Sequence, residues 1–178
     1  MFAQVIQGRT SDPEAVRAAS ERWMQDLSAG ATGWLGSTGG TTDDGRFVVV
    51  VRFEDEEAAR RNSERPEQGR WWSETERALS DATFRDSSDV TVDVIGDPDQ
   101  AGFVQIMHGR VSDPDRAKEL MATDSDKWAA LRPDMLGMVN VGHEDGAYTM
   151  VMYFTSEAAA REGEQKEIPP DMAANMDR

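Results

Sequence analysis

The side chains best suited to chemistry in this sequence are two histidines and a few polar residues set into apolar runs. His108 follows the apolar residues Val104, Ile106 and Met107. An imidazole with an ordinary pKa of about 6.5 can take up and release protons near neutral pH. We therefore predict that His108 is a general base and that Tyr148 is the second catalytic residue. The alternative is a structural, hydrogen-bonding histidine at the end of a strand.

The positions of the two histidines and the lack of cysteine predict that the chain has no metal site. His108 and His143 are both expected at strand ends that lie at the same end of a sheet, with one strand between them. A strand spacing of about 4.8 Å then separates their backbones by roughly 10 Å, which is too far for shared ligation. The chain contains no cysteine, which excludes thiolate nucleophiles, cysteine-bound zinc and iron–sulfur clusters. No phosphate-binding motif is present, because the glycines at 36, 39 and 40 precede no helix, and we predict no cofactor.

Amides and tryptophans are the candidate ligand-binding residues. Gln4 and Gln105 interrupt otherwise apolar strands at equivalent positions. A buried amide must be hydrogen-bonded or must face a polar cavity, so these residues either contact a ligand or pair within the protein. Trp71 and Trp72 follow Pro66 in a segment expected to be irregular. Two adjacent residues do not share one helix face, so we expect one tryptophan to cover a cleft or an interface.

Two tyrosines distinguish the second half of the chain from the first. Tyr148 and Tyr153 occupy the positions that Phe47 and Arg52 hold in the first half. A phenol combines an apolar body with a polar tip, so it can both pack against a ligand and hydrogen-bond to it. We therefore add Tyr153 to the predicted substrate-binding residues and expect the two halves to be specialised.

The sequence is internally duplicated. Residues 2–62 reappear at 103–163 without a gap, at a constant offset of 101. A repeat of this length is too long for a solenoid and matches one small domain. We predict two domains, 1–98 and 99–178, with a Gly-Asp-Pro-Asp linker at 96–99.

Each repeat has the pattern of a ferredoxin-like unit, an α+β fold. In the first repeat we expect strands at 2–9, 33–41 and 46–53, helices from 13 and 55, a further helical piece to 79 and a last strand at 89–95. The second repeat matches with strands at 103–111, 135–142 and 147–154. The Ile-Pro-Pro sequence at 168–170 cannot continue into a strand, so its last strand is missing. An unpaired edge recruits partners, so we expect the tail or a second copy in a homodimer to cover it.

Two tandem units of this order, with Glu-Ala-Ala-Arg-x-Asn at the start of the second helix of the first repeat, resemble a fused form of the dimeric α+β barrel superfamily. The antibiotic-biosynthesis-monooxygenase-like branch is the most similar, and the resemblance extends over nearly the whole chain. It implies a pseudo-dimeric α+β barrel that binds small molecules between sheet and helices. Some members of that branch oxidise aromatic compounds with O₂ and without metal or flavin. The asparagine of their second helix corresponds to Asn62, which adds Asn62 to the substrate-binding set.

Composition narrows the range of partners. The formal net charge is −15 at pH 7, which disfavours nucleic acids and anionic membranes. No signal peptide or long apolar stretch is visible, so we expect a cytoplasmic protein. The function we predict is a cofactor-independent, monooxygenase-like enzyme acting on a small apolar or aromatic substrate. The alternative is a non-catalytic ligand-binding or stress-related interaction protein.

Overall fold

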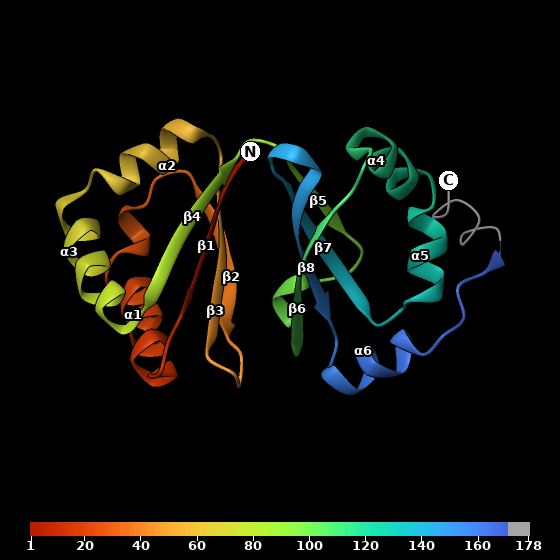
Figure 1. The fold of residues 1–178 in the computed structure, drawn as a ribbon, viewed down its shortest axis with the longest axis horizontal. Coiled ribbons are helices and arrows are strands. Elements are labelled where there is room, and N and C mark those ends of the chain that lie inside the picture. Colours follow the sequence, from red (N-terminus) through yellow and green to blue (C-terminus); the bar gives the residue numbers. More distant parts are fainter. Residues whose placement is uncertain (171–178) are drawn as a thin grey trace. The chain divides into compact units, whose positions relative to one another are not determined.

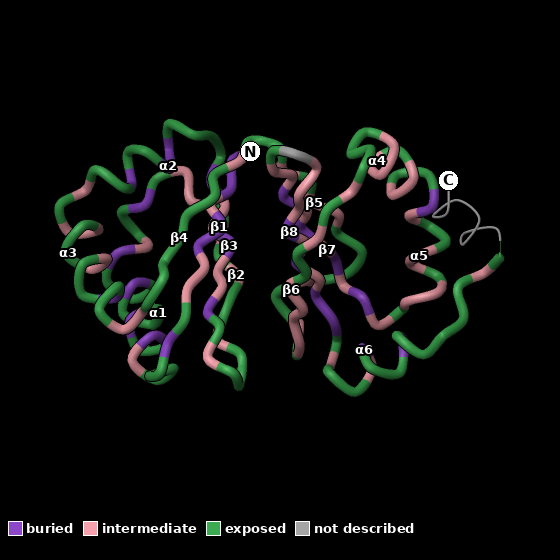
Figure 2. Tube along the Cα trace, viewed as in Figure 1, coloured by how far each residue is buried: buried purple, intermediate pink, exposed green. Residues whose placement is uncertain are grey.

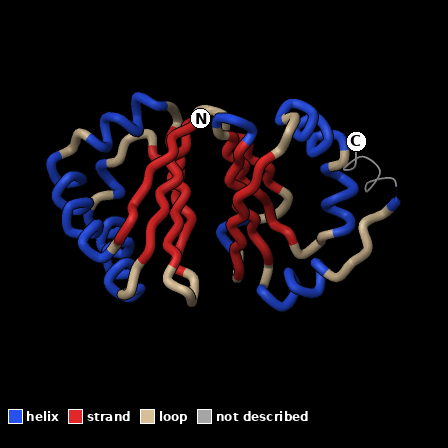
Figure 3. The backbone as a smooth tube through the Cα atoms, in the orientation of Figure 1, coloured by secondary structure: helices blue, strands red, loops and turns tan. Residues whose placement is uncertain are grey.

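The computed structural model describes residues 1–170, except for the side chain of Asp145. The chain divides into two compact units, Met1–Val90 (unit 1) and Thr91–Arg178 (unit 2). The division lies before the boundary at 98 that the linker suggested. Figure 1 labels the elements of both units, and Figure 3 distinguishes helices from strands. Among residues 1–170, no helix is long and apolar enough to cross a membrane.

Unit 1 is one antiparallel sheet with its helices on one face. The sheet has the order β2-β3-β1-β4, and α1, α2 and α3 cover the same face of it (Figures 1 and 3). The central strand β3 contains four consecutive valines at 48–51, which favour extended backbone. The elements are β1 (Phe2–Arg9), α1 (Pro13–Asp26), β2 (Trp34–Thr41), β3 (Arg46–Phe53), α2 (Glu56–Ser63), α3 (Pro66–Thr75) and β4 (Ser80–Ser87), with short 3-10 turns at Ser28–Gly30 and Glu76–Ala78.

The last strand of unit 1 is not the strand expected at 89–95. That place beside β1 is taken by β4, whose residues are almost all exposed. An edge strand is held by backbone hydrogen bonds and needs no apolar alternation, so its sequence carries no strand pattern. The segment expected to be irregular around Trp71 is also regular, because it forms α3 with Pro66 in its first turn.

Unit 2 repeats this plan with differences at both edges. Its sheet has the order β5-β7-β8-β6, so the strand at Val90–Val94 lies beside β7 and not in unit 1. No strand follows α6 within residues up to 170, and β6 lies at the sheet edge. The counterpart of α1 in unit 2 is divided at Asp124 into two helices. The elements are β5 (Val90–Val94), β6 (Phe103–Arg110), α4 (Pro114–Thr123), α5 (Ser125–Leu131), β7 (Met135–Gly142), β8 (Ala147–Phe154) and α6 (Glu157–Glu164), with short 3-10 turns at Pro98–Gln100 and Glu144–Gly146.

The duplication extends to the register of the strands. Phe2 pairs with Phe53 across β1 and β3, and Phe103 pairs with Phe154 across β6 and β8, both shifted by 101. The hairpin glycines match too, because Gly45 has a φ of 80° and Gly146 a φ of 69°. These left-handed turn positions favour glycine over any residue with a Cβ.

Strand alternation defines which residues of unit 1 face the helices. Ile6 of β1 packs in one cluster with Val16 of α1 and Phe47 of β3. Residues two apart in a strand share a face, so Gln4 and Val49 lie on the helix side as well. Figure 2 marks buried stretches along these strands and on the helices. The candidate site described next lies in this layer.

Candidate functional site

Unit 1 contains a cavity of about 510 Å³ between its sheet and its helices. The sheet side of the cavity is formed by alternate residues of β1 and β3, among them Gln4, Ile6, Val49 and Val51. Glycines of β2 continue this wall. The helix side is formed by α1 and α3, with one residue from α2. A volume of this size is in the range of small-molecule sites.

Four tryptophans in mutual contact build the apolar wall of this layer. Ring centroids are 5.1 Å apart for Trp34 and Trp23, 6.5 Å for Trp23 and Trp71, and 6.1 Å for Trp71 and Trp72. Trp72 in turn meets Phe84 of β4 edge to face at 5.0 Å. Three of these rings, those of Trp23, Trp71 and Trp72, line the cavity. Such offset and edge-on geometries are the ones that aromatic quadrupoles favour.

Hydrogen bonds fix the orientation of the tryptophan walls. The Trp23 indole N–H donates to Oε1 of Gln68 at 2.7 Å, and the Trp71 indole N–H donates to the Ala19 carbonyl at 2.8 Å. Trp71 packs against the cluster around Trp23, whereas Trp72 packs against the cluster around Ile6. The adjacent tryptophans thus serve two different clusters, and both line the cavity. Both can do so because, together with Gln68 and Thr75, they form an i, i+3, i+4, i+7 stripe on one side of α3.

Three amides supply polarity to the cavity wall. Asn62 is 6% exposed, and its Oδ1 accepts a hydrogen bond from Nη1 of Arg65 at 2.9 Å. This bond leaves the Asn62 NH₂ group as a donor for a ligand. Gln68 is held in a similar way by Trp23. The side-chain amide of Gln4 has no hydrogen-bonding partner among residues 1–170. This half-buried amide therefore retains both a donor and an acceptor for a molecule in the cavity.

The cavity is electrically neutral apart from one ion pair. Among its lining residues, Glu14 and Arg17 of α1 are the ionisable ones, and they pair with each other. Both side chains are mostly exposed. An isolated charge in such an apolar site would be costly, so this arrangement suits an uncharged ligand.

The eight predicted site residues fall into two groups. Unit 1 brings together four of them, Gln4, Asn62, Trp71 and Trp72, around one cavity. The other four belong to unit 2 and do not line that cavity. They are Gln105 and His108 on β6 and Tyr148 and Tyr153 on β8.

His108 and Tyr148 point to opposite faces of the sheet of unit 2. Phe154 packs on Ala160 of α6, so the even-numbered residues of β8, including Tyr148, face the helices. His108 pairs in register with Thr149, one residue away from Tyr148. The sheet therefore separates the base from the phenol predicted to act with it, and the structure does not assemble them as one catalytic pair.

The two histidines converge on a buried hydroxyl. Nδ1 of His108 lies 3.0 Å from Oγ1 of Thr149, and Nε2 of His143 lies 2.9 Å from the same oxygen. Thr149 is fully buried and lies on β8 between β6 and β7, in agreement with the strand order expected from the sequence. Among the described residues, no cluster of three or more His, Cys, Asp or Glu side chains is arranged to hold a metal ion.

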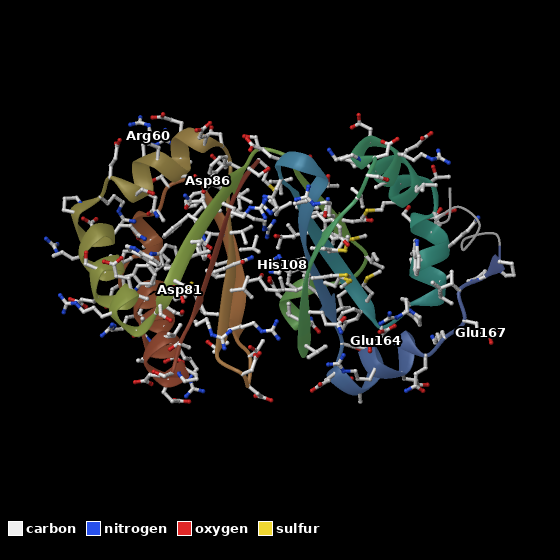
Figure 4. All side chains as sticks on the ribbon, in the orientation of Figure 1. Arg60, Asp81, Asp86, His108, Glu164 and Glu167 are labelled. Carbon is white, nitrogen blue, oxygen red and sulfur yellow. The ribbon has the colours of Figure 1, made fainter. Side chains whose placement is uncertain are left out.

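On the helix side of unit 2, Gln105 forms a short hydrogen bond with α6. Its Nε2 donates to Oε1 of Glu164 at 2.6 Å, and Figure 4 labels Glu164 on α6. This bond, more than any other contact, holds the pKa of Glu164 below its ordinary value, with a smaller contribution from Arg161. The carboxylate therefore stays ionised. Gln105 is thus partly paired within the protein, unlike its counterpart Gln4.

Sequence reasoning missed three residues of the unit 1 site. Trp23 and Gln68 form one wall, and Arg65 bonds both Asn62 and the Leu27 carbonyl. The helical spacing of Trp23 indicated only a core position, and nothing in the sequence indicated the Gln68 or Arg65 contacts. These contacts join α1 to α2 and α3 over about forty residues of chain, and no local pattern encodes such pairings.

Comparisons with known proteins agree on the fold. No family model and no curated protein matches the chain. The "putative monooxygenase" of Lactobacillus acidophilus superposes with a TM-score of 0.74 at 13% identity over 99% of this chain and 87% of that one. That of Fusobacterium nucleatum gives 0.73 at 11% identity over 99% and 85%. An anthrone oxidase-like protein gives 0.67 at 12% identity over 99% and 83%.

These likenesses extend over both repeats, and at such low identity they concern the fold alone. The chain has the tandem ferredoxin-like α+β fold of these proteins. The α+β fold of two tandem ferredoxin-like halves that was expected from the sequence is confirmed.

Proposed function

We propose that unit 1 binds a small, uncharged aromatic molecule and oxidises it with O₂ as a cofactor-independent, monooxygenase-like enzyme. The observation that carries this proposal is the cavity of about 510 Å³ walled by three tryptophans and three amides. Aromatic walls favour a flat, apolar ligand through edge and offset contacts. The solved structures of the same fold are described as monooxygenases or as anthrone oxidase-like, which supports the same reaction class.

In this reaction the substrate itself supplies the electrons. An electron-rich aromatic ring activated by a hydroxyl or enol can reduce O₂ directly. One oxygen atom becomes a new carbonyl oxygen on the oxidised CH₂ carbon, and the other leaves with its two hydrogens as water. The tryptophans would hold the ring, and the NH₂ groups of Asn62 and Gln4 would donate to the oxygen on which negative charge develops. The ordered cavity also fixes the ring orientation relative to O₂.

The binding step is tested by titrating the protein with 2-naphthol and following tryptophan fluorescence. Four of the five tryptophans belong to unit 1, so quenching reports on this cavity. Gln4→Ala and Asn62→Ala should each raise Kd about three- to tenfold, the effect of losing one hydrogen bond. Gln25→Ala, at an exposed glutamine of α1 that does not line the cavity, is the matched control and should leave the quenching curve unchanged. Absence of saturable quenching would refute the proposal.

The reaction step is tested by oxygen uptake with anthrone in buffer treated with a chelator. We expect protein-dependent conversion to the quinone, slowed in Asn62→Ala. Binding without oxygen uptake would favour the alternative of a non-catalytic ligand-binding protein. One observation favours that alternative: inside the cavity, the only ionisable lining residues are the paired Glu14 and Arg17, so no free general base is provided.

The catalytic role predicted for His108 from the sequence has its own test, because His108 belongs to unit 2 and does not line the unit 1 cavity. If His108 is the base, His108→Ala lowers turnover about 10²–10⁴-fold and leaves the Kd for 2-naphthol unchanged. Its bond to Thr149 also gives it a structural role. A variant with unchanged turnover and a lower melting temperature would assign it that structural role alone.

We also propose that the chain forms a homodimer through the edge strand β6. Its second edge has no neighbouring strand within residues 1–170, and an open edge pairs readily with another strand. The tail also expected to cover this edge lies in part at 171–178, outside the described residues. Light scattering should give twice the chain mass, and a monomer at all concentrations would contradict this proposal.

A further inference from the structure

The helix-facing side of the unit 2 sheet is lined with methionines. Ile6, Ser37, Val49 and Val51 line the unit 1 cavity, and the residues 101 positions later are Met107, Met138, Met150 and Met152. Four different positions of one wall have thus become methionine. These four are drawn from ten methionines in the whole chain.

The strand registers show that these positions are spatially equivalent. Ile6 pairs with Val49 across β1 and β3, and Met107 pairs with Met150 across β6 and β8. Ser37 pairs with Val51, and Met138 pairs with Met152. Figure 4 shows sulfur atoms, in yellow, gathered between the strands of unit 2 and its helices. The methionines therefore form one continuous wall, which we call the methionine wall.

The methionine wall is incompletely covered by protein. Met107 is 43% exposed, and the other three are half-buried. In unit 1 the covering helix α1 buries Val16, Ala19 and Trp23, whereas α4 and α5 of unit 2 bury no residue of their own among those described. Flexible thioether side chains that are left open in this way can adapt to a ligand and make favourable sulfur–aromatic contacts.

One polar group beside the methionine wall determines which ligands the site prefers. Gln105, the counterpart of Gln4, uses its N–H to bond Glu164, and its own Oε1 remains an acceptor. Tyr148 lies at the same wall, with its hydroxyl 4.0 Å from the Met107 sulfur. Glu164 pairs with Arg161 at 3.2 Å, and the formal net charge of −15 disfavours an anionic ligand. A ligand here therefore needs a neutral aromatic body and a hydroxyl donor.

We propose that unit 2 carries a second small-molecule site on its methionine wall, which takes a neutral hydroxylated aromatic molecule. The amide donor that Asn62 supplies in unit 1 has no equivalent, because Gly163 stands at that position and the Arg132 side chain fills the space beside it. The second site therefore has flexible thioether side chains and no counterpart of the Asn62 donor, and Gln105 Oε1 accepts the hydrogen bond from its ligand. The proposal does not depend on occupation of the unit 1 cavity.

Nuclear magnetic resonance of the full chain with ¹³C-methyl methionine tests this proposal, with 2-naphthol as the probe. We expect saturable shifts of the methyl signals of Met107, Met138, Met150 and Met152. The methyl of Met24, which lines the unit 1 cavity, reports on the first site in the same spectrum. The anion 2-naphthoate should leave the four signals unchanged, and 2-methoxynaphthalene, which has no hydroxyl donor, should bind about three- to tenfold more weakly.

Two matched variants separate the sites. Met107 and Met24 are both exposed methionines, at 43% and 51%, so replacement of either by glutamate is compatible with folding. Met107→Glu should weaken binding at unit 2 at least about tenfold, because the bound probe would remove water from the new carboxylate. The same variant should leave the titration of the Met24 signal unchanged. Met24→Glu should leave the four unit 2 signals responsive. Shifts confined to Met24, or an unchanged unit 2 affinity in Met107→Glu, would overturn the second site.

Discussion

At the scale of single residues, Arg65 connects the candidate site to the rest of unit 1. Its guanidinium donates to Asn62 Oδ1 at 2.9 Å and to the Leu27 carbonyl at 3.1 Å, and its side chain is 18% exposed. The bond to Asn62 determines which atom of that amide remains for a ligand. Arg65 is thus a positioning residue that acts on a ligand through Asn62.

We expect Arg65→Lys to weaken 2-naphthol binding about three- to tenfold, because a lysine cannot bond both acceptors with a fixed planar group. In the Asn62→Ala background, Arg65→Lys should have no further effect on Kd. Fluorescence titration of the two single variants and the double variant measures this coupling. Additive effects of the two substitutions would contradict the positioning role.

The ionisation of Asp134 makes the stability of unit 2 depend on pH. Its two carboxylate oxygens accept from Arg132 at 3.0 and 2.8 Å, and its side chain is 9% exposed. The hydrogen bonds from Arg132 lower the pKa of Asp134 below its ordinary value of 3.8. A lowered acid pKa stabilises the fold above pH 3.8, and this contribution is lost as pH falls through the lowered pKa.

We expect Asp134→Asn to lower the free energy of unfolding at pH 7 by about 1.5–3 kcal/mol, the range for a hydrogen bond to a charged group. The difference from the unsubstituted protein should shrink steadily below pH 3.8. Urea unfolding across this pH range measures it. Glu14→Gln, in an exposed ion pair, is the control and should change stability little at any pH. A constant difference down to pH 2 would contradict the assignment.

At the scale of elements, the two repeats begin their first helices with the same device. Asp12 accepts a hydrogen bond from the Ala15 N–H at 3.0 Å, and Asp113 accepts one from the Arg116 N–H at 2.9 Å. A proline follows each aspartate in the first turn. Aspartate here also interacts favourably with the positive end of the helix dipole.

We expect Asp12→Ala and Asp113→Ala each to cost about 1 kcal/mol of stability. Thermal unfolding by circular dichroism gives both values, and Asp12→Ser and Asp113→Ser, which keep a capping oxygen, should recover most of the loss. A cost confined to one repeat would mean that the caps, although alike in geometry, do not support their helices equally.

The elements also show where sequence patterns fail. The helix starts and the buried strands were predicted from residues that act on their near neighbours. The strand β4 was missed because exposed edge residues such as Asp81 and Arg85 carry no apolar alternation. The strand β5 was recognised but assigned to the wrong repeat, because the choice between two sheets is made by pairing partners distant in the chain.

At the scale of the whole molecule, the formal net charge of −15 is the dominant electrostatic property. Self-repulsion among like charges destabilises the compact state, and salt screens it over a Debye length of about 8–10 Å at physiological ionic strength. The same charge favours neutral ligands over anionic ones at both proposed sites.

We therefore expect the melting temperature to rise by several degrees between about 20 and 300 mM NaCl, most steeply at the low end, where screening changes fastest. Differential scanning calorimetry at constant pH measures this rise. Sodium and potassium chloride should act alike if screening is the cause. A melting temperature that falls with salt would indicate that the exposed ion pairs outweigh the repulsion.

The sequence by itself determined the duplicated architecture. The repeat offset and the strand and helix patterns of each repeat can be read along the chain, so the α+β class and the equivalence of the two repeats follow from them. Gln4 could be chosen as a site residue because it interrupts an otherwise apolar strand, and Asn62 because the family resemblance places it at the asparagine of the second helix.

Only the tertiary structure decided which candidates share a site. It placed Trp71, Trp72, Gln4 and Asn62 around one cavity and added Trp23 and Gln68 from distant positions. It also put His108 and Tyr148 on opposite faces of one sheet, because their strands pair His108 with Thr149 and not with Tyr148. Side chains alternate along a strand, so a difference of one residue in register exchanges the two faces, and that register is a property of the folded pair of strands.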